Sequence, residues 1–312
     1  MRILVAYDAS PTAQEACRLI DHAAWPDGST VDVLTCFEPN VPNTLWAIGA
    51  VDPNGSQDAY DAEREAARDT AREGAQLIRR PELAVTARIA EGRTATAILD
   101  VAAELHADLL VAGTRGLGPL RSSILGSVSS ELVENATCPV LVVRGPAVGR
   151  VLLAYDDSGP ARHAVRLLAG WPMFQHCPVR VVTVAPRSHR PGEADLLVPA
   201  VVPPVGDGSD DLRATAAEIA SRAVDPLRAA GLEVDVDVRV DHAAHAIVCA
   251  ASEWHADLIV TGRSGHGLVN RLLIGSVARN VLHHAPCSVL VVHAPAKVEG
   301  PAGVEVPVTA SA

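Results

Sequence analysis

The segment His106–Gly116 reads HADLLVAGTRG, and His255–Gly265, 149 residues further along the chain, reads HADLIVTGRSG. Each copy combines a short apolar run with a glycine-rich turn, which is typical of a buried strand that ends in a loop. The chain has 312 residues, and a typical domain spans about 100–200 residues. The repeat therefore predicts two copies of one domain.

Two further pairs of segments repeat in the same order along the chain. Ile3–Ser10 (ILVAYDAS) returns as Val151–Ser158 (VLLAYDDS), and Cys138–Val143 returns as Cys287–Val292. A repeat of this length is a whole domain, because the units of solenoid proteins span only about 20–50 residues.

The repeat also sets the expected domain boundaries. We expect one domain at residues 1–145 and a second at residues 150–294. The short Gly/Pro segment Gly145–Gly149 is the expected linker. Residues 295–312 lose the repeated pattern and are expected to form a flexible tail.

The chain is acidic and rich in aliphatic residues. It carries 26 Lys and Arg against 37 Asp and Glu, a formal net charge of −11, whereas nucleic-acid-binding domains are usually basic. Hydrophobic residues make up 48% and aromatic residues only 3%, so the expected core consists of Val, Leu, Ile and Ala, as in a parallel sheet covered by helices. We therefore expect no nucleic acid as a partner.

Neither a membrane segment nor a signal peptide is expected. The longest apolar runs, such as Leu109–Ala112, are far shorter than the ~20 residues that span a bilayer. The first residues, MRILVAYD, enter a strand-like run directly and lack a long apolar region before it. The six cysteines form no CxxC pair, so we expect buried free thiols and a cytoplasmic location.

Strand-like and helix-like segments alternate within each half. In the first half, strands are expected at residues 3–7, 31–37, 83–90, 108–112 and 140–144. Helices are expected between them at residues 11–24, 58–79, 94–106 and 127–135. The second half repeats this alternation and predicts the same α/β fold, a doubly wound parallel five-stranded sheet in each half. Ligands of such sheets lie beyond the carboxyl ends of the strands.

A glycine-rich loop follows the fourth expected strand of each half. Both loops read G-x2-G-x9-G-S, with these residues at Gly113, Gly116, Gly126, Ser127, Gly262, Gly265, Gly275 and Ser276. Glycine lets the backbone approach an oxyanion, and a helix that begins at Gly-Ser presents free N–H donors and its positive dipole end. The loop matches neither a Walker A motif nor a dinucleotide G-x-G-x-x-G motif. We interpret it as a phosphate-binding loop; a plain turn is the alternative, because duplication copies structure as well as function.

With these motifs the chain resembles a tandem universal stress protein of the ATP-binding branch. The resemblance rests on the strand ends at Asp8 and Asp156, the HAD segments, both glycine loops, and the closing strands that begin at Cys138 and Cys287. It extends over about residues 1–144 and 150–293. It implies a Rossmann-like fold in each half and the binding of ATP, which we expect to carry Mg²⁺.

The resemblance also assigns roles to individual positions. Asp8 and Asp156 are expected beside the adenosine, and backbone groups near Cys36 and Val184 are expected to hold adenine. The phosphates are expected on the glycines and serines of both loops. Val128 and Val277 are expected to line the pocket, and Arg115 and Arg263 are expected to face the phosphates.

Two positions depart from the family pattern. Asp241 stands in the second half where Gly92 stands in the first, which can reshape the second pocket. Ser288 stands where the first half has Pro139, which can alter how the closing strand pairs. Because an open apolar edge is a template for aggregation, we expect the two closing strands to pair antiparallel within the chain. A homodimer of such chains is expected in addition.

The sequence offers one candidate pattern for a metal site and none for a catalytic site. Asp241, His242 and His245 form a D-H-x-x-H pattern that can place two imidazoles on one helix face for zinc. No second ligand cluster accompanies it, so no metal site is expected. No Ser-His-Asp arrangement or nucleophile elbow stands out, so no catalytic residue is expected.

Three functions remain open. The first is a nucleotide-binding regulator of stress response or growth control, in which ATP changes the conformation or the partners of the chain. The second is a slow ATPase or phosphotransferase, although neither a P-loop lysine nor an evident base is present. The third is an interaction module that binds no nucleotide. We expect the first, with an unidentified regulatory protein as partner and at most weak ATP hydrolysis.

Overall fold

The computed structural model describes residues 1–38, 53–114, 125–185, 209–265 and 274–293. The first half contains, in chain order, β1 (Arg2–Ala6), α1 (Pro11–His22), β2 (Thr30–Phe37), α3 (Pro53–Gln76), β3 (Ala84–Glu91), α4 (Thr94–Glu104), β4 (Leu109–Gly113), α5 (Ser127–Asn135) and β5 (Val140–Val143). The second half contains β6 (Val151–Ala154), α6 (Gly159–Gly170), a 3-10 turn (Pro172–Phe174), β7 (Val179–Ala185), α7 (Ser209–Ala229), β8 (Val234–Val240), α8 (Ala243–Trp254), β9 (Leu258–Gly262), α9 (Ser276–His284) and β10 (Ser288–Val292). The expected tail at residues 295–312 lies outside the described residues.

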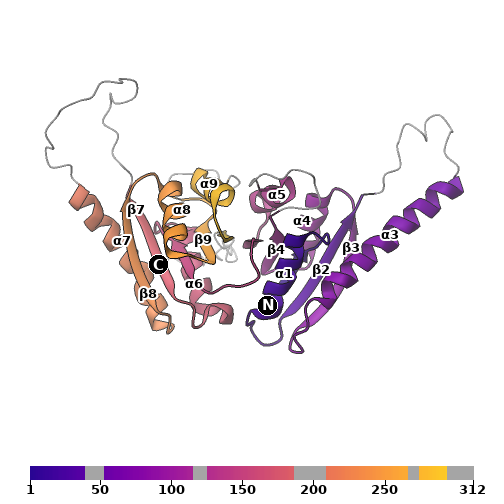
Figure 1. Ribbon diagram of the computed structural model, residues 1–312, viewed down its shortest axis with the longest axis horizontal. Coiled ribbons are helices and arrows are strands. Elements are labelled where there is room, and N and C mark those ends of the chain that lie inside the picture. The colour runs from indigo at the N-terminus through magenta and orange to yellow at the C-terminus, as the bar shows by residue number, and fades with distance from the viewer. Residues whose placement is uncertain (39–52, 115–124, 186–208, 266–273, 294–312) are drawn as a thin grey trace, which may run out of the picture.

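The strands of both halves join into one sheet with the order β3-β2-β1-β4-β5-β10-β9-β6-β7-β8. Within each half neighbouring strands run parallel. This confirms the predicted α/β fold with two tandem parallel sheets, which the structure merges into a single ten-stranded one. Figure 1 shows the halves side by side, with α3 and α7 at the two far ends.

Helices cover both faces of the sheet. α1, α3, α6 and α7 pack on one face, and α4, α5, α8 and α9 pack on the other. Successive strand residues therefore serve different cores: Ile3 and Val5 face the first set, and Leu4 faces the second. Burial on both faces explains why β4 reads as an uninterrupted apolar run. Among the described helices, none is both long and apolar enough to cross a bilayer.

The two halves meet where β5 pairs antiparallel with β10, and Val142 lies opposite Val289. This pairing confirms that the closing strands associate within the chain. Arg144 ends the pair: its backbone N–H donates to Ser288 Oγ at 3.0 Å, and its guanidinium donates to the Leu282 carbonyl at 2.6 Å. Ser288, at the position of Pro139 in the first half, therefore supplies an acceptor that proline lacks.

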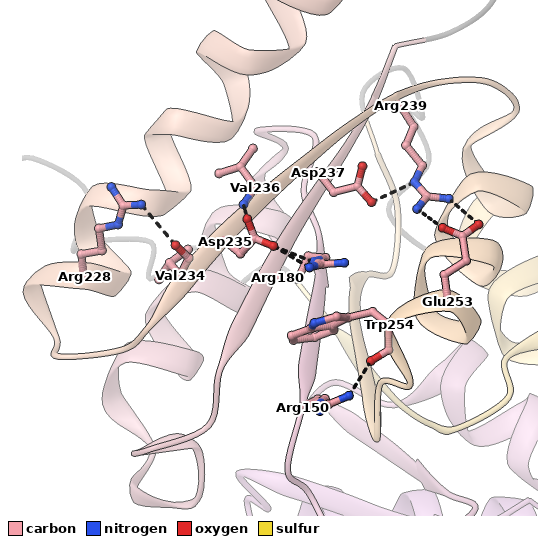
Figure 2. A network of polar contacts seen from close by, with 10 residues as sticks. All are labelled: Arg150, Arg180, Arg228, Val234, Asp235, Val236, Asp237, Arg239, Glu253 and Trp254. Carbon is pink, nitrogen blue, oxygen red and sulfur yellow. Dashed lines mark hydrogen bonds and ion pairs between the residues drawn. The ribbon is translucent and has the colours of Figure 1, made fainter.

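A network of ion pairs fastens β8 to its neighbours in the second half (Figure 2). Arg239 pairs with Asp237 of its own strand and with Glu253 of α8, at 2.9 and 2.6 Å. Arg180 of β7 pairs with Asp235 and stacks over the Trp254 ring, with its guanidinium carbon 4.8 Å from the ring centre. Ion pairs thus join β8 to both β7 and α8.

All six cysteines are free thiols. Four of them are buried, as expected: Cys17, Cys138, Cys177 and Cys287. The other two are partly exposed, which differs from the expectation: Cys36 and Cys249.

Candidate functional site

The carboxyl ends of the first and fourth strands of each half lie side by side. β1 and β4 pair in parallel with Ala6 opposite Ala112, and β6 and β9 pair with Ala154 opposite Thr261. The strand order reverses at this point, and in open parallel sheets ligands bind outside such a reversal. The fold therefore brings the expected aspartates and the described ends of the two glycine loops to the same edge.

An aspartate follows the first strand of each half and shapes the turn into the next helix. Asp8 Oδ1 accepts the N–H of Ser10 at 3.0 Å, and Asp156 Oδ1 accepts the N–H of Ser158 at 3.0 Å. Each serine then caps its helix, since its hydroxyl oxygen accepts a backbone N–H of the first turn at 3.3 Å. One carboxylate oxygen thus fixes the turn, and the same carboxylate stands at the edge where a ribose is expected.

Two threonines that the sequence analysis missed support this turn. Thr35 Oγ1 donates to the carbonyl of Tyr7 at 2.9 Å, and Thr183 Oγ1 donates to the carbonyl of Tyr155 at 3.0 Å. Both hydroxyls are buried and hold the chain directly before the aspartate. Their equal offset from the two tyrosines was the signal in the sequence.

The glycine that ends the fourth strand is required for packing. A Cβ on Gly113 would lie 2.4 Å from Thr12 Oγ1 and 2.9 Å from the Ala13 nitrogen, at the start of α1. A Cβ on Gly262 would lie 2.9 Å from Pro160 Cβ, at the start of α6. These glycines let the strand end approach a helix, and this accounts for their presence without a phosphate contact.

The later glycine of each loop begins a helix. Gly126 and Gly275 are the N-cap residues of α5 and α9, and neither helix has a side-chain cap. The N–H of Gly126 donates to the Thr114 carbonyl at 2.8 Å, and that of Gly275 donates to the Arg263 carbonyl at 2.7 Å. These bonds close the base of each loop.

The donors that remain at these helix starts belong to the first turn. Backbone N–H groups at Ser127 and Val128, and at Ser276 and Val277, have no partner within their helices, as in any α-helix. In the first half, Ser129 Oγ also donates to the Gly113 carbonyl at 2.7 Å and ties α5 to β4. Both helix starts therefore offer positive dipole ends at the carboxyl edge of the sheet.

The structure describes only one of the two loop arginines. Arg115 and Gly116 lie outside the described residues. Arg263 is buried, and its guanidinium donates to the carbonyl of Glu134 in α5, across the joint between the halves. Burial lowers the pKa of Arg263, and the nearby Glu134 opposes this shift. Its guanidinium is thus engaged at the joint, and the phosphate contact expected of Arg263 stays a prediction.

Gly265 connects the second loop to its aspartate. A Cβ at this position would lie 2.5 Å from Asp156 Oδ2. The loop backbone therefore passes directly beside the carboxylate, as a shared site requires. Only a residue without a side chain fits here while Asp156 keeps its position.

The expected adenine and pocket positions lie along the same edge. Cys36 and Val184 are the next-to-last residues of β2 and β7. The Cys36 thiol contacts the Thr94 carbonyl, with sulfur and oxygen 3.7 Å apart, and burial raises its pKa to about 11. Val128 and Val277 are partly buried and pack against the core below α5 and α9.

The segment before α8 differs from its counterpart in the first half. Gly92 has a φ of +121°, a conformation that favours glycine, whereas Asp241 anchors its own neighbours. Asp241 Oδ1 accepts the N–H of His242 at 2.7 Å, and Oδ2 contacts His245 Nδ1 at 2.8 Å. In the part of the chain that the structure describes, no three His, Cys, Asp or Glu side chains converge to hold a metal ion.

Known proteins share both the sequence and this architecture. A universal stress protein of Thermus aquaticus is 36% identical over 148 residues, which are 46% of this chain and 97% of that protein. A universal stress protein structure from Archaeoglobus fulgidus matches with a TM-score of 0.63 at 20% identity and covers 94% of this chain and 96% of its own. A universal stress protein solved in complex with cAMP covers 47% of this chain and 99% of its own, with 23% identity and a TM-score of 0.34. The model of the universal stress protein family matches residues 1–144 and again residues 148–293, so the chain belongs to this family and carries two of its domains in tandem.

Proposed function

We propose that each half of the chain binds ATP with Mg²⁺ at the carboxyl edge of its sheet, and that occupancy regulates the conformation or partners of the chain in stress response. One observation carries this proposal. In both halves an uncapped helix begins after the fourth strand, and a carboxylate that one serine N–H already fixes follows the first strand, which pairs with the fourth. A ligand that places an anion at the helix start and a ribose at the carboxylate is a nucleotide.

The parts of the nucleotide are assigned to groups that the fold brings to this edge. The N–H groups of Ser127 and Val128 in the first half are assigned to phosphate, and Asp8 is assigned to the ribose. Backbone groups beside Cys36 are assigned to adenine. Mg²⁺ is usually held by phosphates and only one or two carboxylates. This fits an edge where Asp8 and Asp156 follow the first strand of each half, and the phosphates would hold most of its coordination sphere.

The two sites differ in their surroundings. Arg263 is engaged with Glu134, so phosphate binding in the second half depends on the backbone donors of Ser276 and Val277. Asp241 replaces the glycine that opens the corresponding segment of the first half. We therefore expect the first site to bind ATP more tightly than the second.

A proline at the first helical position tests the assigned donors. Gly126 has φ −68° and ψ 154°, and Gly275 has φ −65° and ψ 152°; both conformations are compatible with a following proline. Proline is also favoured at the first position of a helix. Ser127→Pro and Ser276→Pro therefore each delete one N–H donor while the helix keeps its start. Ser127→Ala is the matched control for loss of the hydroxyl alone.

Calorimetric titration of the full chain with Mg-ATP is expected to show two sites. Each proline variant is expected to weaken one of them about tenfold or more, because hydrogen bonds to charged groups contribute roughly 1.5–3 kcal/mol. Unchanged binding in both proline variants with normal circular dichroism would contradict the assignment. Phosphate release measured in the same samples separates a regulator from a slow ATPase, and light scattering tests the expected homodimer.

A further inference from the structure

The side chains of Asp241, which lies just before α8, and of His245 and Cys249 on α8 form a connected line. His245 Nδ1 lies 2.8 Å from Asp241 Oδ2, and His245 Nε2 lies 3.5 Å from Cys249 Sγ. His245 and Cys249 are four residues apart and lie one turn apart on the helix, and Asp241 precedes its N-cap residue, His242. Sequence reasoning considered only the two histidines for zinc and did not include Cys249. The Cys249 thiol, a nucleophile, thus contacts the imidazole of His245, a base, and the Asp241 carboxylate orients that imidazole.

The hydrogen bonds define what each group does. Asp241 accepts the Nδ1–H proton, which leaves the lone pair of Nε2 directed at the thiol. Bonds from His245 and from the His242 N–H lower the pKa of Asp241, so the carboxylate is ionised at neutral pH. Arg239, the cation that pairs with Glu253 of α8, is engaged there, as Figure 2 shows. The imidazole can therefore take the thiol proton, and Asp241 stabilises the resulting imidazolium.

Cys249 differs from the other thiols in its exposure to solvent and in the side chain that it contacts. Four cysteines are buried, and only Cys36 and Cys249 are partly exposed. Cys36 contacts a carbonyl oxygen, which cannot take up its proton, and burial raises its pKa to about 11. Cys249 instead contacts an imidazole whose side chain is 68% exposed, so small molecules reach the pair from solvent. The first half has Gly92, Thr96 and Asp100 at the matching positions, so the line belongs to the second half alone.

We propose that Cys249 is a site of reversible thiolation, at which the chain exchanges with small disulfides of the form R–S–S–R. His245 Nε2 takes the thiol proton, and the thiolate sulfur attacks one sulfur of the disulfide. A bond forms between Cys249 and that sulfur while the old S–S bond breaks, and the departing thiolate takes the proton from the imidazolium. Cys249 is oxidised and the leaving sulfur is reduced, so no further oxidant is needed. The proposal is independent of nucleotide binding.

Timed labelling of the purified full chain with the neutral disulfide dithiodipyridine tests this site, with peptide mass spectrometry to locate the labelled cysteine. Cys249 is expected to react first, and at least about tenfold faster than Cys36, which serves as the internal control. Oxidised glutathione is expected to give a mixed disulfide at the same residue, and a reducing agent removes it.

Two histidine variants separate a chemical role from a structural one. His245→Ala is expected to slow labelling of Cys249 to about the rate of Cys36, and free imidazole in the buffer is expected to restore part of the loss. His242→Ala removes the neighbouring imidazole but keeps the backbone N–H that donates to Asp241, and it is expected to leave the rate unchanged. If Cys249 reacts no faster than Cys36, or if His245→Ala leaves its rate unchanged, the proposal is overturned.

Discussion

Replacing Gly113 by alanine adds one methyl group at the most crowded glycine of the candidate site. The new Cβ would lie 2.4 Å from Thr12 Oγ1, which can rotate away. It would also lie 2.9 Å from the Ala13 nitrogen and 2.9 Å from the Thr12 carbonyl carbon. These backbone atoms belong to the first turn of α1, so relief requires β4 and α1 to move apart.

The expected cost follows from two opposing effects. Overpacking a tight site costs about 1–3 kcal/mol. Alanine also restricts the unfolded chain, which stabilises the folded state by about 0.4–1 kcal/mol. Gly113→Ala is therefore expected to lower the free energy of unfolding by about 1–2 kcal/mol. Gly262→Ala is expected to cost less, because its nearest neighbours are Pro160 Cβ at 2.9 Å and the Ala161 nitrogen at 3.3 Å.

Urea denaturation followed by circular dichroism measures both variants. Gly145→Ala is the matched control, since a Cβ there meets no atom within 4 Å, and it is expected to be neutral or slightly stabilising. Gly113→Ala is expected to destabilise the chain most, Gly262→Ala less, and Gly145→Ala least. A Gly113→Ala chain as stable as wild type would refute the packing role and return this glycine to the phosphate interpretation.

Three other changes have expected outcomes in the same denaturation assay. Val142→Asp places an unpaired carboxylate in the buried joint and is expected to cost about 3 kcal/mol or more; a smaller loss would show that the joint opens easily. Burial lowers the pKa of His293 to about 4. Between about pH 6.5 and 4 the unfolded chain therefore binds a proton that the folded chain does not. The free energy of unfolding is expected to fall by up to roughly 3 kcal/mol as the pH falls through this range. His293→Gln should flatten that pH dependence. Arg263→Ala removes a buried donor to the Glu134 carbonyl and is expected to cost about 2–3 kcal/mol. Arg279→Ala breaks a half-exposed ion pair with the Glu134 carboxylate and is expected to cost less than about 1 kcal/mol. Equal losses in the two variants would contradict the burial of Arg263.

Features that depend on local spacing were predictable from the sequence. The alternating elements, the five-stranded halves and the strand-end aspartates all follow from patterns that extend over a few residues and occur twice. The pairing of β5 with β10 was also predictable, because an apolar closing strand needs a partner. Duplication made each of these signals visible a second time.

Features that depend on distant packing were not predictable. A glycine in the sequence shows only that no side chain is present, so Gly113 could not reveal whether a helix or a phosphate lies against it. The direction of Arg263 depends on the joint, which brings α5 beside a loop 129 residues further along the chain. Cys249 was missed for a simpler reason, since the zinc interpretation stopped one helical turn before it.

The joint explains why the two halves had to diverge at particular positions. β5 and β10 pair antiparallel, so α5 and α9, which follow the two glycine loops, come to lie near each other around a cavity of about 140 Å³. Equivalent residues of the two copies line this cavity: Leu125 with Ile274, Ser130 with Arg279, and Glu134 with His283.

Identical copies would place identical side chains on both sides of such a joint. Two copies of the second half would bring arginines and histidines together, without the carboxylate that now receives Arg279. The present chain avoids this because the first half supplies Glu134 and the second supplies Arg263 and Arg279. The complementary charges favour pairing of a first half with a second half over pairing of like halves. Because a linker of a few residues already holds the two halves together, the joint forms within one chain, and Arg263 of the second glycine loop takes part in it.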